Sequence, residues 1–226
     1  QQSAIARIQP EDPFLSFHRF QHIYMPLLYV LYSLNWFLVR DFKDFRNIGW
    51  GSNKELKLGR KDLLELIGAK LLYFSLMVIL PSLISPLHWG WFLLGFFIKH
   101  AAASLFGVLA LVSVHVGADA VFFQAGKDDH FEESWAELQF LSAIDFSPKN
   151  RLIRFLFGGF NLHTCHHLFP HINHIHYPAI TCIMRSVAAE YRLPYRSRSL
   201  GAALISHWHF LRNHSMQPQE ILEEAF

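Results

Sequence analysis

The sequence predicts an all-α integral membrane protein, made of a helical hairpin of two transmembrane helices, an interfacial helix and a cytoplasmic helical region rich in histidine. Three observations predict this fold. Of the 226 residues, 52% are hydrophobic and only 17% are charged, which is apolar for a soluble domain. Three long apolar stretches stand out along the chain, and a cluster of histidines follows the last of them.

The three apolar stretches cover residues 23–39, about 63–87 and 89 to about 116. A helix needs about 20 predominantly apolar residues to cross a bilayer, and the last two stretches are long enough. We therefore expect residues 63–116 to form a hairpin that enters the membrane and returns. The first stretch is short, and basic residues both precede and follow it, which favours a helix in the membrane interface over a full span.

The distribution of positive charge predicts which ends of the hairpin are cytoplasmic. The loop before it carries seven basic residues: Arg40, Lys43, Arg46, Lys54, Lys57, Arg60 and Lys61. Cytoplasmic loops are enriched in Lys and Arg, so this loop is expected to be cytoplasmic. The turn at 85–89 carries no Lys or Arg, as expected of the opposite side. Trp89 and Trp91 are the expected interfacial anchors there. Four more basic residues follow the hairpin: Lys127, Lys149, Arg151 and Arg154. Lys99 falls near mid-bilayer, where a charge is costly and is expected to face protein or water.

Further helices are expected in the cytoplasmic region. Pro148 and Asn150 mark a turn before the apolar segment 151–160, which ends in a Gly pair. Pro178 can begin a helix that runs to about Tyr191, because proline is tolerated at the first helical position. Another helical stretch covers 199–214.

The histidine cluster contains the spacing H-x-x-H-H, formed by His163, His166 and His167. On a helix these positions share one face, so three neutral imidazoles can converge as metal ligands. Pro170 is expected to end this helical turn. Imidazole suits zinc, copper and iron alike, so the spacing leaves the metal open. A surface histidine patch or hydrogen-bonded core histidines are the alternative interpretation.

His115 is a fourth candidate ligand, because it lies near the cytoplasmic end of the returning span. An ionisable side chain at that depth marks a functional site by default. The hairpin would bring it to the face where the histidine cluster docks. A histidine hydrogen-bonded to a backbone carbonyl between helices is the alternative.

Charge and cysteine content exclude some classes of protein. The formal net charge is only +2, and the 20 Lys and Arg form no stripe interleaved with aromatic residues, which argues against a nucleic-acid partner. Cys165 and Cys182 are too few for a disulfide framework. The first residues carry no recognisable targeting pattern.

Several motifs resemble those of one family. They are FHRFQH at 17–22, FLVRDFKDF at 37–45 and above all GGFNLHTCHHLFPHINHIHYPAI at 158–180, with LPYR near 193 and SHWHFL near 206. The chain thereby resembles the membrane fatty acid desaturases, in the branch of front-end acyl-lipid and linoleoyl-CoA desaturases. The likeness covers nearly the whole chain, and HHLFPHI followed by HYPAI is its most specific part.

The resemblance implies a non-haem di-iron enzyme that uses O2 and two electrons to insert a double bond into the acyl chain of an acyl-CoA or membrane lipid. It implies that His163, His166 and His167 are the third histidine box and that His115 is the additional ligand from a transmembrane helix. The enzyme would lie in a bacterial inner membrane or the endoplasmic reticulum, with its active site on the cytoplasmic side. Three later histidines are expected to support the site: His171, His174 and His176.

The electron donor is expected to be a separate protein of the ferredoxin or cytochrome b5 type, because no H-P-G-G haem motif occurs here. A domain outside these residues is the other possible source of electrons. The donor and the lipid or acyl-CoA substrate are therefore the expected partners.

The sequence also departs from the family pattern. The first two histidine boxes do not occur in it; His18 and His22 have a similar spacing but match the FHRFQH stretch. Cys165 stands where this branch commonly has Glu, and Leu138 where relatives often carry His. We expect residues 1–226 to be the C-terminal part of a single desaturase domain, inactive alone and holding iron substoichiometrically.

Two other classes share parts of this pattern. A membrane di-iron lipid hydroxylase or ketolase would carry the same boxes, and product analysis separates it from a desaturase. A non-catalytic membrane metal-binding protein would lack further histidine boxes upstream. Double-bond position, chain length and acyl carrier do not follow from the residues.

Overall fold

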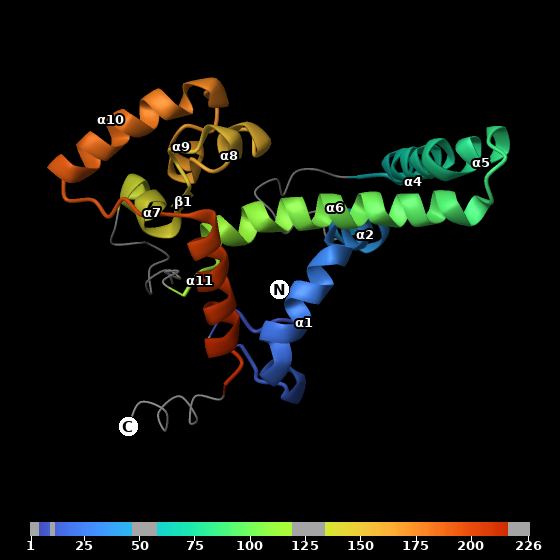
Figure 1. Cartoon of the computed structure of the whole chain (residues 1–226), viewed down its shortest axis with the longest axis horizontal. Helices are drawn as coiled ribbons and strands as arrows, with labels where there is room; N and C mark the ends of the chain where they lie inside the picture. The colour runs from blue at the N-terminus through green and yellow to red at the C-terminus, as the bar shows by residue number, and fades with distance from the viewer. Residues whose placement is uncertain (1–4, 10–11, 47–57, 119–133, 217–226) are drawn as a thin grey trace. The chain divides into compact units, whose positions relative to one another are not determined.

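The computed structural model describes residues 5–9, 12–46, 58–118 and 134–216 (Figure 1). The chain forms two compact units, one of residues 26–108 and one of residues 1–25 with 109–226, and each is described by itself. The positions of Lys54, Lys57 and Lys127, used above for orientation, lie outside the described residues.

The described residues are mainly helical, as the sequence predicts. The first helical run comprises η1 (Ser16–Phe20), α1 (Gln21–Leu28), η2 (Tyr29–Leu31), α2 (Tyr32–Asn35), η3 (Trp36–Arg40) and α3 (Asp41–Arg46). The hairpin comprises α4 (Arg60–Phe74), η4 (Ser75–Ile79), α5 (Leu80–Ile84) and α6 (Trp89–His115). The rest comprises α7 (Trp135–Ser142), β1 (Asp145–Phe146), α8 (Arg151–Leu156), α9 (His163–Leu168), η5 (His174–His176), α10 (Tyr177–Glu190), β2 (Ser197–Arg198) and α11 (Leu200–Asn213).

Three continuous helical runs are long and apolar enough to cross a membrane: Ser16–Arg46, Arg60–Ile84 and Trp89–His115, with mean hydropathies of 1.3, 2.0 and 1.8. The last two confirm the predicted helical segments of the hairpin. The first run has 31 residues and extends beyond the predicted 23–39 at both ends. Its interfacial placement stays a prediction, because its length and composition also suit a span.

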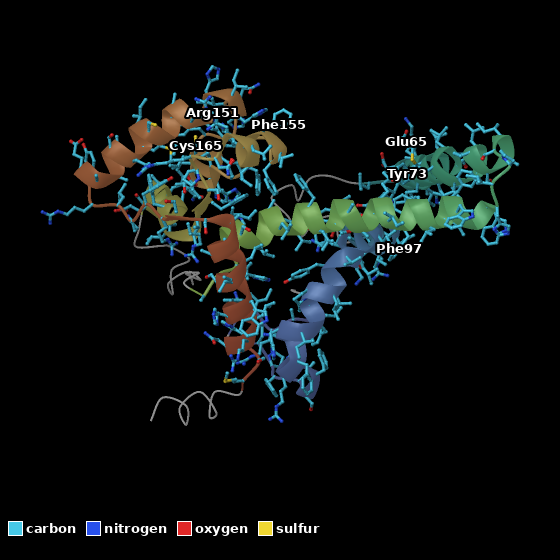
Figure 2. All side chains as sticks on the ribbon, in the orientation of Figure 1. Glu65, Tyr73, Phe97, Arg151, Phe155 and Cys165 are labelled. Atoms are coloured by element: carbon cyan, nitrogen blue, oxygen red, sulfur yellow. The ribbon has the colours of Figure 1, made fainter. Side chains whose placement is uncertain are left out.

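Local sequence explains where the hairpin helices begin and turn. At the start of α4, Asp62 accepts a hydrogen bond from the Gly59 backbone N–H at 2.7 Å, which satisfies a donor that the helix leaves unpaired. Trp89, which begins α6 after the uncharged turn, is 58% exposed. Phe97 also projects outward from α6 (Figure 2) and is 43% exposed, as expected of a lipid-facing side chain.

Lys99, the charge predicted near mid-bilayer, has polar partners. Its Nζ donates to the Tyr73 hydroxyl of α4 at 2.5 Å (Figure 2 labels Tyr73), and that hydroxyl lies 3.2 Å from His100 Nε2. On the other side of the imidazole, His100 Nδ1 lies 2.6 Å from the Ser33 hydroxyl of α2. This chain of contacts links α2, α4 and α6, and satisfies polar groups that would be costly in hydrocarbon.

A second polar contact joins α3 to α4. Lys70 Nζ lies 2.6 Å from the Asp41 carboxylate, and the two side chains are 12% and 31% exposed. The Lys70 ammonium also donates to the Phe37 carbonyl and lies 4.4 Å from the Phe37 ring centroid. The ammonium is thus largely enclosed by protein groups.

We expect Lys70→Met to reduce the stability of the protein in detergent by about 1–2 kcal/mol, because Asp41 loses its cation in a mostly enclosed site. The midpoint of thermal unfolding measures this. The charge-reversed pair Asp41→Lys with Lys70→Asp should recover only part of the loss, because a carboxylate at position 70 cannot donate to the Phe37 carbonyl. Lys61→Met is the matched control, since the Lys61–Glu65 pair is 89% and 66% exposed. Equal midpoints for Lys70→Met and Lys61→Met would contradict the expectation.

The other unit is built around two apolar clusters. One contains Phe140, Leu162, Cys165, Tyr177, Met184 and Ala188, and so joins α7, α9 and α10. The other contains Val114, Phe146 and Ala203, and joins α6, β1 and α11. These clusters place the start of α9 and the end of α6 in one packed region.

The N-terminal segment is held to α11 by buried polar contacts. Gln21, which is fully buried, donates from its amide to the Leu211 carbonyl at 2.9 Å and accepts from the Arg7 backbone N–H at 2.9 Å. The Arg7 guanidinium donates to the Met216 carbonyl at 3.0 Å. Buried polar groups need such partners, so this segment is specifically docked.

The described residues also contain one small parallel pair of strands that the sequence did not predict. Asp145 of β1 is opposite Ser197 of β2, and Phe146 is opposite Arg198. The pair covers too few residues to give a periodic signal in the sequence. The strand β1 of this pair also contacts α9, the helix that carries His163, His166 and His167.

Candidate metal centre

Three of the four predicted ligands meet at one point. His163 and His167 lie one helical turn apart on α9, and His115 is the last residue of α6. His163 Nε2 is 2.8 Å from His115 Nε2 and 2.9 Å from His167 Nε2. Among the described residues, these three side chains form the one group of three or more potential ligands whose ligand atoms all lie within 4.8 Å of one another.

A glycine turn leads the chain into α9. Gly158 and Gly159 have φ values of 55° and 78°, which glycine adopts without the steric cost of a Cβ. A Cβ on Gly159 would lie 2.9 Å from the Cβ of His174, so the turn also permits a close approach of the later loop. From this turn α9 runs to Leu168 and ends two residues before Pro170, as predicted.

The outer nitrogens of two of the imidazoles contact oxygen acceptors. His167 Nδ1 lies 2.8 Å from Gln139 Oε1. The Gln139 amide is oriented by a hydrogen bond from its Nε2 to the Trp135 carbonyl at 3.1 Å, so its oxygen faces His167. The Ser142 backbone carbonyl accepts from His115. Such outer partners commonly fix the tautomer of a metal-bound histidine.

These contacts determine what the three Nε2 atoms can do. With protons held on Nδ1, His115 and His167 both direct an Nε2 lone pair toward His163 Nε2. The single Nε2 proton of a neutral His163 can be donated to only one of these two nitrogens. In at least one of the two contacts, therefore, two nitrogen lone pairs face each other without a proton between them. A cation shared by the three atoms would make every contact favourable, so the residues fit a metal ion.

Two of the three imidazoles of α9, those of His163 and His167, are kept neutral by their surroundings. Burial lowers the pKa of His163 to about 2, with further lowering by the nearby His115 and His167. Burial also lowers the pKa of His167 to about 4. Metal ligation requires deprotonated imidazole, so these environments favour the form that binds metal.

The comparisons with known proteins show the family of the chain. The family model for fatty acid desaturase matches residues 3–199. The chain belongs to the fatty acid desaturase family. No solved structure matches it.

Several similar proteins are named as acyl-lipid or linoleoyl-lipid desaturases. The chain is 29% identical to an acyl-lipid (8-3)-desaturase of Physcomitrium patens over 93% of this chain and 42% of the relative. It is 27% identical to an sn-1 linoleoyl-lipid 6-desaturase of Arthrospira platensis over 95% of this chain and 58% of the relative. It is 29% identical to acyl-lipid (8-3)-desaturase B of Dictyostelium discoideum over 91% of this chain and 46% of the relative. The chain thus spans about half the length of these desaturases.

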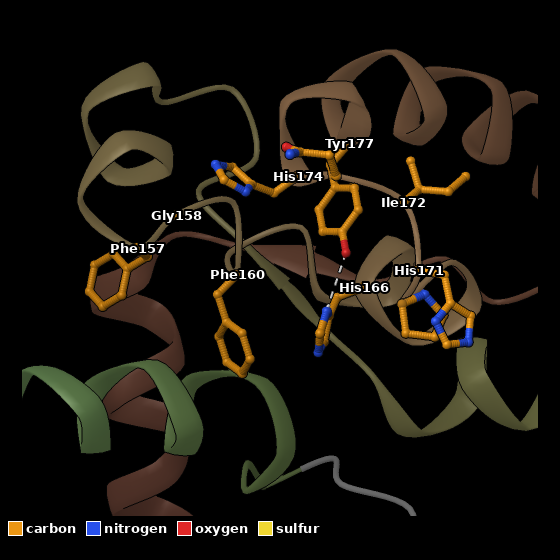
Figure 3. Close-up of a pocket in the computed structure, with 10 residues that line it drawn as sticks. Phe157, Gly158, Phe160, His166, His171, Ile172, His174 and Tyr177 are labelled. Carbon is orange, nitrogen blue, oxygen red and sulfur yellow. Dashed lines mark hydrogen bonds between the residues drawn. The ribbon is translucent and has the colours of Figure 1, made fainter.

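His166, the fourth ligand that the desaturase motif implies, does not join the three imidazoles. Its Nδ1 lies 3.3 Å from the Tyr177 hydroxyl (Figure 3). It faces an open cavity of about 500 Å³ that is also lined by Phe157, Phe160, His171, Ile172 and His174. Helical spacing alone places His166 on the same face as His163 and His167, but its contact with Tyr177 of α10 accompanies a ring orientation toward this cavity.

The other histidines considered in the sequence analysis, His18, His22, His171, His174 and His176, are not in the group of three. His171, His174 and His176 are exposed, and the first two line the cavity beside His166. His18 is buried, and its Nδ1 accepts from the Leu15 backbone N–H at 3.1 Å. His22 packs edge-on against Trp208 of α11 at 5.8 Å between ring centroids. Their positions suit structural roles.

Cys165 is fully buried in the core behind the histidine helix, whereas Cys182 is exposed. Burial raises the pKa of the Cys165 thiol to about 11. The reactive thiolate is then scarce near neutral pH. This environment gives Cys165 the character of a packing residue.

We expect iodoacetamide at pH 8 to alkylate Cys182 and leave Cys165 unmodified, because Cys165 is inaccessible and protonated. Peptide mass spectrometry after a short exposure measures both sites. Unfolding in denaturant before labelling should expose both thiols and serves as the control. Equal modification of the two cysteines in the folded protein would contradict the buried placement.

Three residues that contact the histidine helix α9 were not predicted as part of the site. Gln139 contacts His167, Tyr177 contacts His166, and the Asp145 carboxylate of β1 accepts from the first turn of α9. The sequence holds one local signal for Gln139, which is that its neighbour Leu138 stands where relatives often carry His. The contacts of Tyr177 and Asp145 depend on packing between elements.

Proposed function

We propose that this chain supplies the third histidine box, and a ligand from a membrane helix, to the non-haem di-iron centre of a fatty acid desaturase. The centre would take part in the O2-dependent insertion of a double bond into an acyl chain. The observation that carries the proposal is the convergence of His115, His163 and His167 at the end of an apolar hairpin in a chain of the desaturase family.

The residues of this chain would bind and orient the metal. His115, His163 and His167 would supply Nε2 ligands, and His166, which lies beside them, would be free to meet an ion held partly by other ligands. Bound iron would supply O2 activation with two electrons from a donor protein. Gln139 and the Ser142 carbonyl hold the protons of two imidazoles on Nδ1, away from the metal side.

The substrate we propose is an acyl chain carried by a membrane lipid, in keeping with the names of the relatives; acyl-CoA is the alternative carrier. The apolar helices hold the protein in the membrane from which such a chain would enter. We place the metal centre on the cytoplasmic side, where a ferredoxin or a cytochrome b5 type protein could deliver electrons. This placement is supported by the basic residues before and after the hairpin.

The test is expression of the complete reading frame that contains these residues in a yeast host supplied with linoleate. Fatty acids are then analysed by gas chromatography with mass spectrometry. We expect a product with one additional double bond, and none from the His163→Gln variant. A hydroxylated or ketonic product would assign the related oxygenase class instead. Metal binding without any oxidised product would favour a non-catalytic metal-binding protein.

A further inference from the structure

Asp145 is a fully buried carboxyl group that the proposed ligand set does not use. It lies on β1, and its Oδ1 accepts a hydrogen bond from the Thr164 backbone N–H at 2.9 Å. The His163 backbone N–H also donates to it. Its Oδ2 accepts from the Tyr195 hydroxyl at 2.6 Å. All of its identified partners are therefore neutral donors.

A buried carboxyl group is expensive unless hydrogen bonds compensate for the lost water. Burial accordingly raises the pKa of Asp145, while the hydrogen bonds from Tyr195, Thr164 and His163 act in the opposite direction. Two of these donors are the first two backbone amides of α9, which carry partial positive charge at the helix start. The carboxyl group therefore holds the helix at the end where His163 lies.

The support behind Asp145 is rigid. The Asp145 backbone N–H donates to the Arg196 carbonyl at 3.1 Å, within the pairing of β1 with β2. The next residue, Phe146, donates its backbone N–H to the Asn161 carbonyl at 3.0 Å and accepts from the Asn161 side-chain amide at 3.1 Å. The chain is thus attached to β1 at Asn161, two residues before His163, and again at Thr164, immediately after it.

These contacts matter because His163 is the central ligand. Its Nε2 is the atom that lies within 2.9 Å of both other Nε2 atoms, so a shift of its backbone changes both contacts. The buried Nδ1 of His163 has no side-chain partner such as Gln139, which contacts His167, and its identified contact is with the Phe160 backbone. The direction of this imidazole must therefore be set mainly through its backbone and its packing.

We propose that Asp145 is a positioning residue for the metal centre, holding the first turn of α9 so that His163 Nε2 points at His115 and His167. This inference rests on the proposed metal site. Asp145 is not part of the convergent group of ligand atoms, and its oxygens accept hydrogen bonds from Thr164, His163 and Tyr195. Its role is comparable to that of the outer partners that orient metal ligands, whose loss typically weakens metal binding about 10–100-fold.

The experiment uses Co²⁺ as the probe, added to the whole 226-residue chain in lipid nanodiscs. The cobalt absorption bands report ligand geometry, and chelator competition gives affinity. We expect Asp145→Ala to weaken Co²⁺ binding about 10–100-fold and to shift the cobalt bands. Asp145→Asn keeps one oxygen acceptor for the Thr164 amide but cannot also accept from Tyr195, so it should lose less affinity than Asp145→Ala and still shift the cobalt bands. It replaces the alanine variant if that one does not fold.

Met184→Ala is the matched control, because Met184 is buried in the same core cluster as Leu162 and Cys165 and belongs to the packing, not to the hydrogen bonds that hold His163. It should lower the thermal midpoint while leaving the cobalt spectrum and affinity unchanged well below that midpoint. Native affinity together with native cobalt bands would overturn the positioning role while leaving the metal site standing. This holds for folded Asp145→Ala, and for Asp145→Asn if only that variant folds. No difference between the native chain and His163→Ala would instead overturn the metal site itself.

Discussion

Replacing His163 with alanine is expected to weaken the binding of one Co²⁺ ion by about a hundredfold or more, which exceeds the loss typical of an outer partner. His163 Nε2 lies 2.8 Å from His115 Nε2 and 2.9 Å from His167 Nε2, so it is the atom common to both contacts. Without it, two imidazoles remain, whereas zinc-type catalytic sites commonly use three protein ligands. Chelator competition with the purified chain measures the affinity.

His166→Ala is the matched control for this result. His166 belongs to the same H-x-x-H-H motif, but its Nδ1 contacts the Tyr177 hydroxyl and its ring faces a cavity. We expect the affinity for the first ion to change by less than about threefold, because His166 is not among the three convergent imidazoles. If both variants lose affinity equally, the motif acts as one unit and the division seen in the structure is wrong.

The parts of this fold that follow from local patterns could be predicted from the sequence. The hairpin is encoded by two apolar runs and an uncharged turn, and its bounds in the structure, Arg60–Ile84 and Trp89–His115, are close to those expected. The meeting of His163 with His167 follows from their spacing of one helical turn. His115 could be proposed because a returning helix must end near the side from which the hairpin began.

The remaining features depend on contacts between distant segments. Asp145 lies on β1, which pairs with β2 about fifty positions later in the chain. Its contact with the start of α9 is likewise a contact between separate elements. The side position of His166 depends on Tyr177, which belongs to another helix. Lys99 looked anomalous for the same reason, since its partner Tyr73 lies on the facing helix of the hairpin. Periodicity in one segment cannot report such contacts.

The metal-free chain is expected to lose stability as the pH falls below about 6.5. The pKa of His163 is 6.5 before folding and about 2 in the folded protein. Between these values the unfolded state binds a proton that the folded state does not, so the free energy of unfolding decreases as pH falls. The loss is about 1.4 kcal/mol per pH unit, or about 2 kcal/mol between pH 6.5 and 5. His167, with its pKa lowered to about 4, acts in the same direction.

Thermal midpoints of the metal-free chain from pH 8 to 5 test this expectation. His163→Ala should reduce the pH dependence by about half although it lowers the midpoint at pH 8, because the variant no longer excludes a proton from this position whereas His167 still does. His209→Ala, at an exposed site on α11, should leave the slope as it is in the native chain. An unchanged slope in His163→Ala would mean that other groups control acid sensitivity. A reduced slope would show that the same burial which keeps His163 ready to bind metal makes the empty site intolerant of acid.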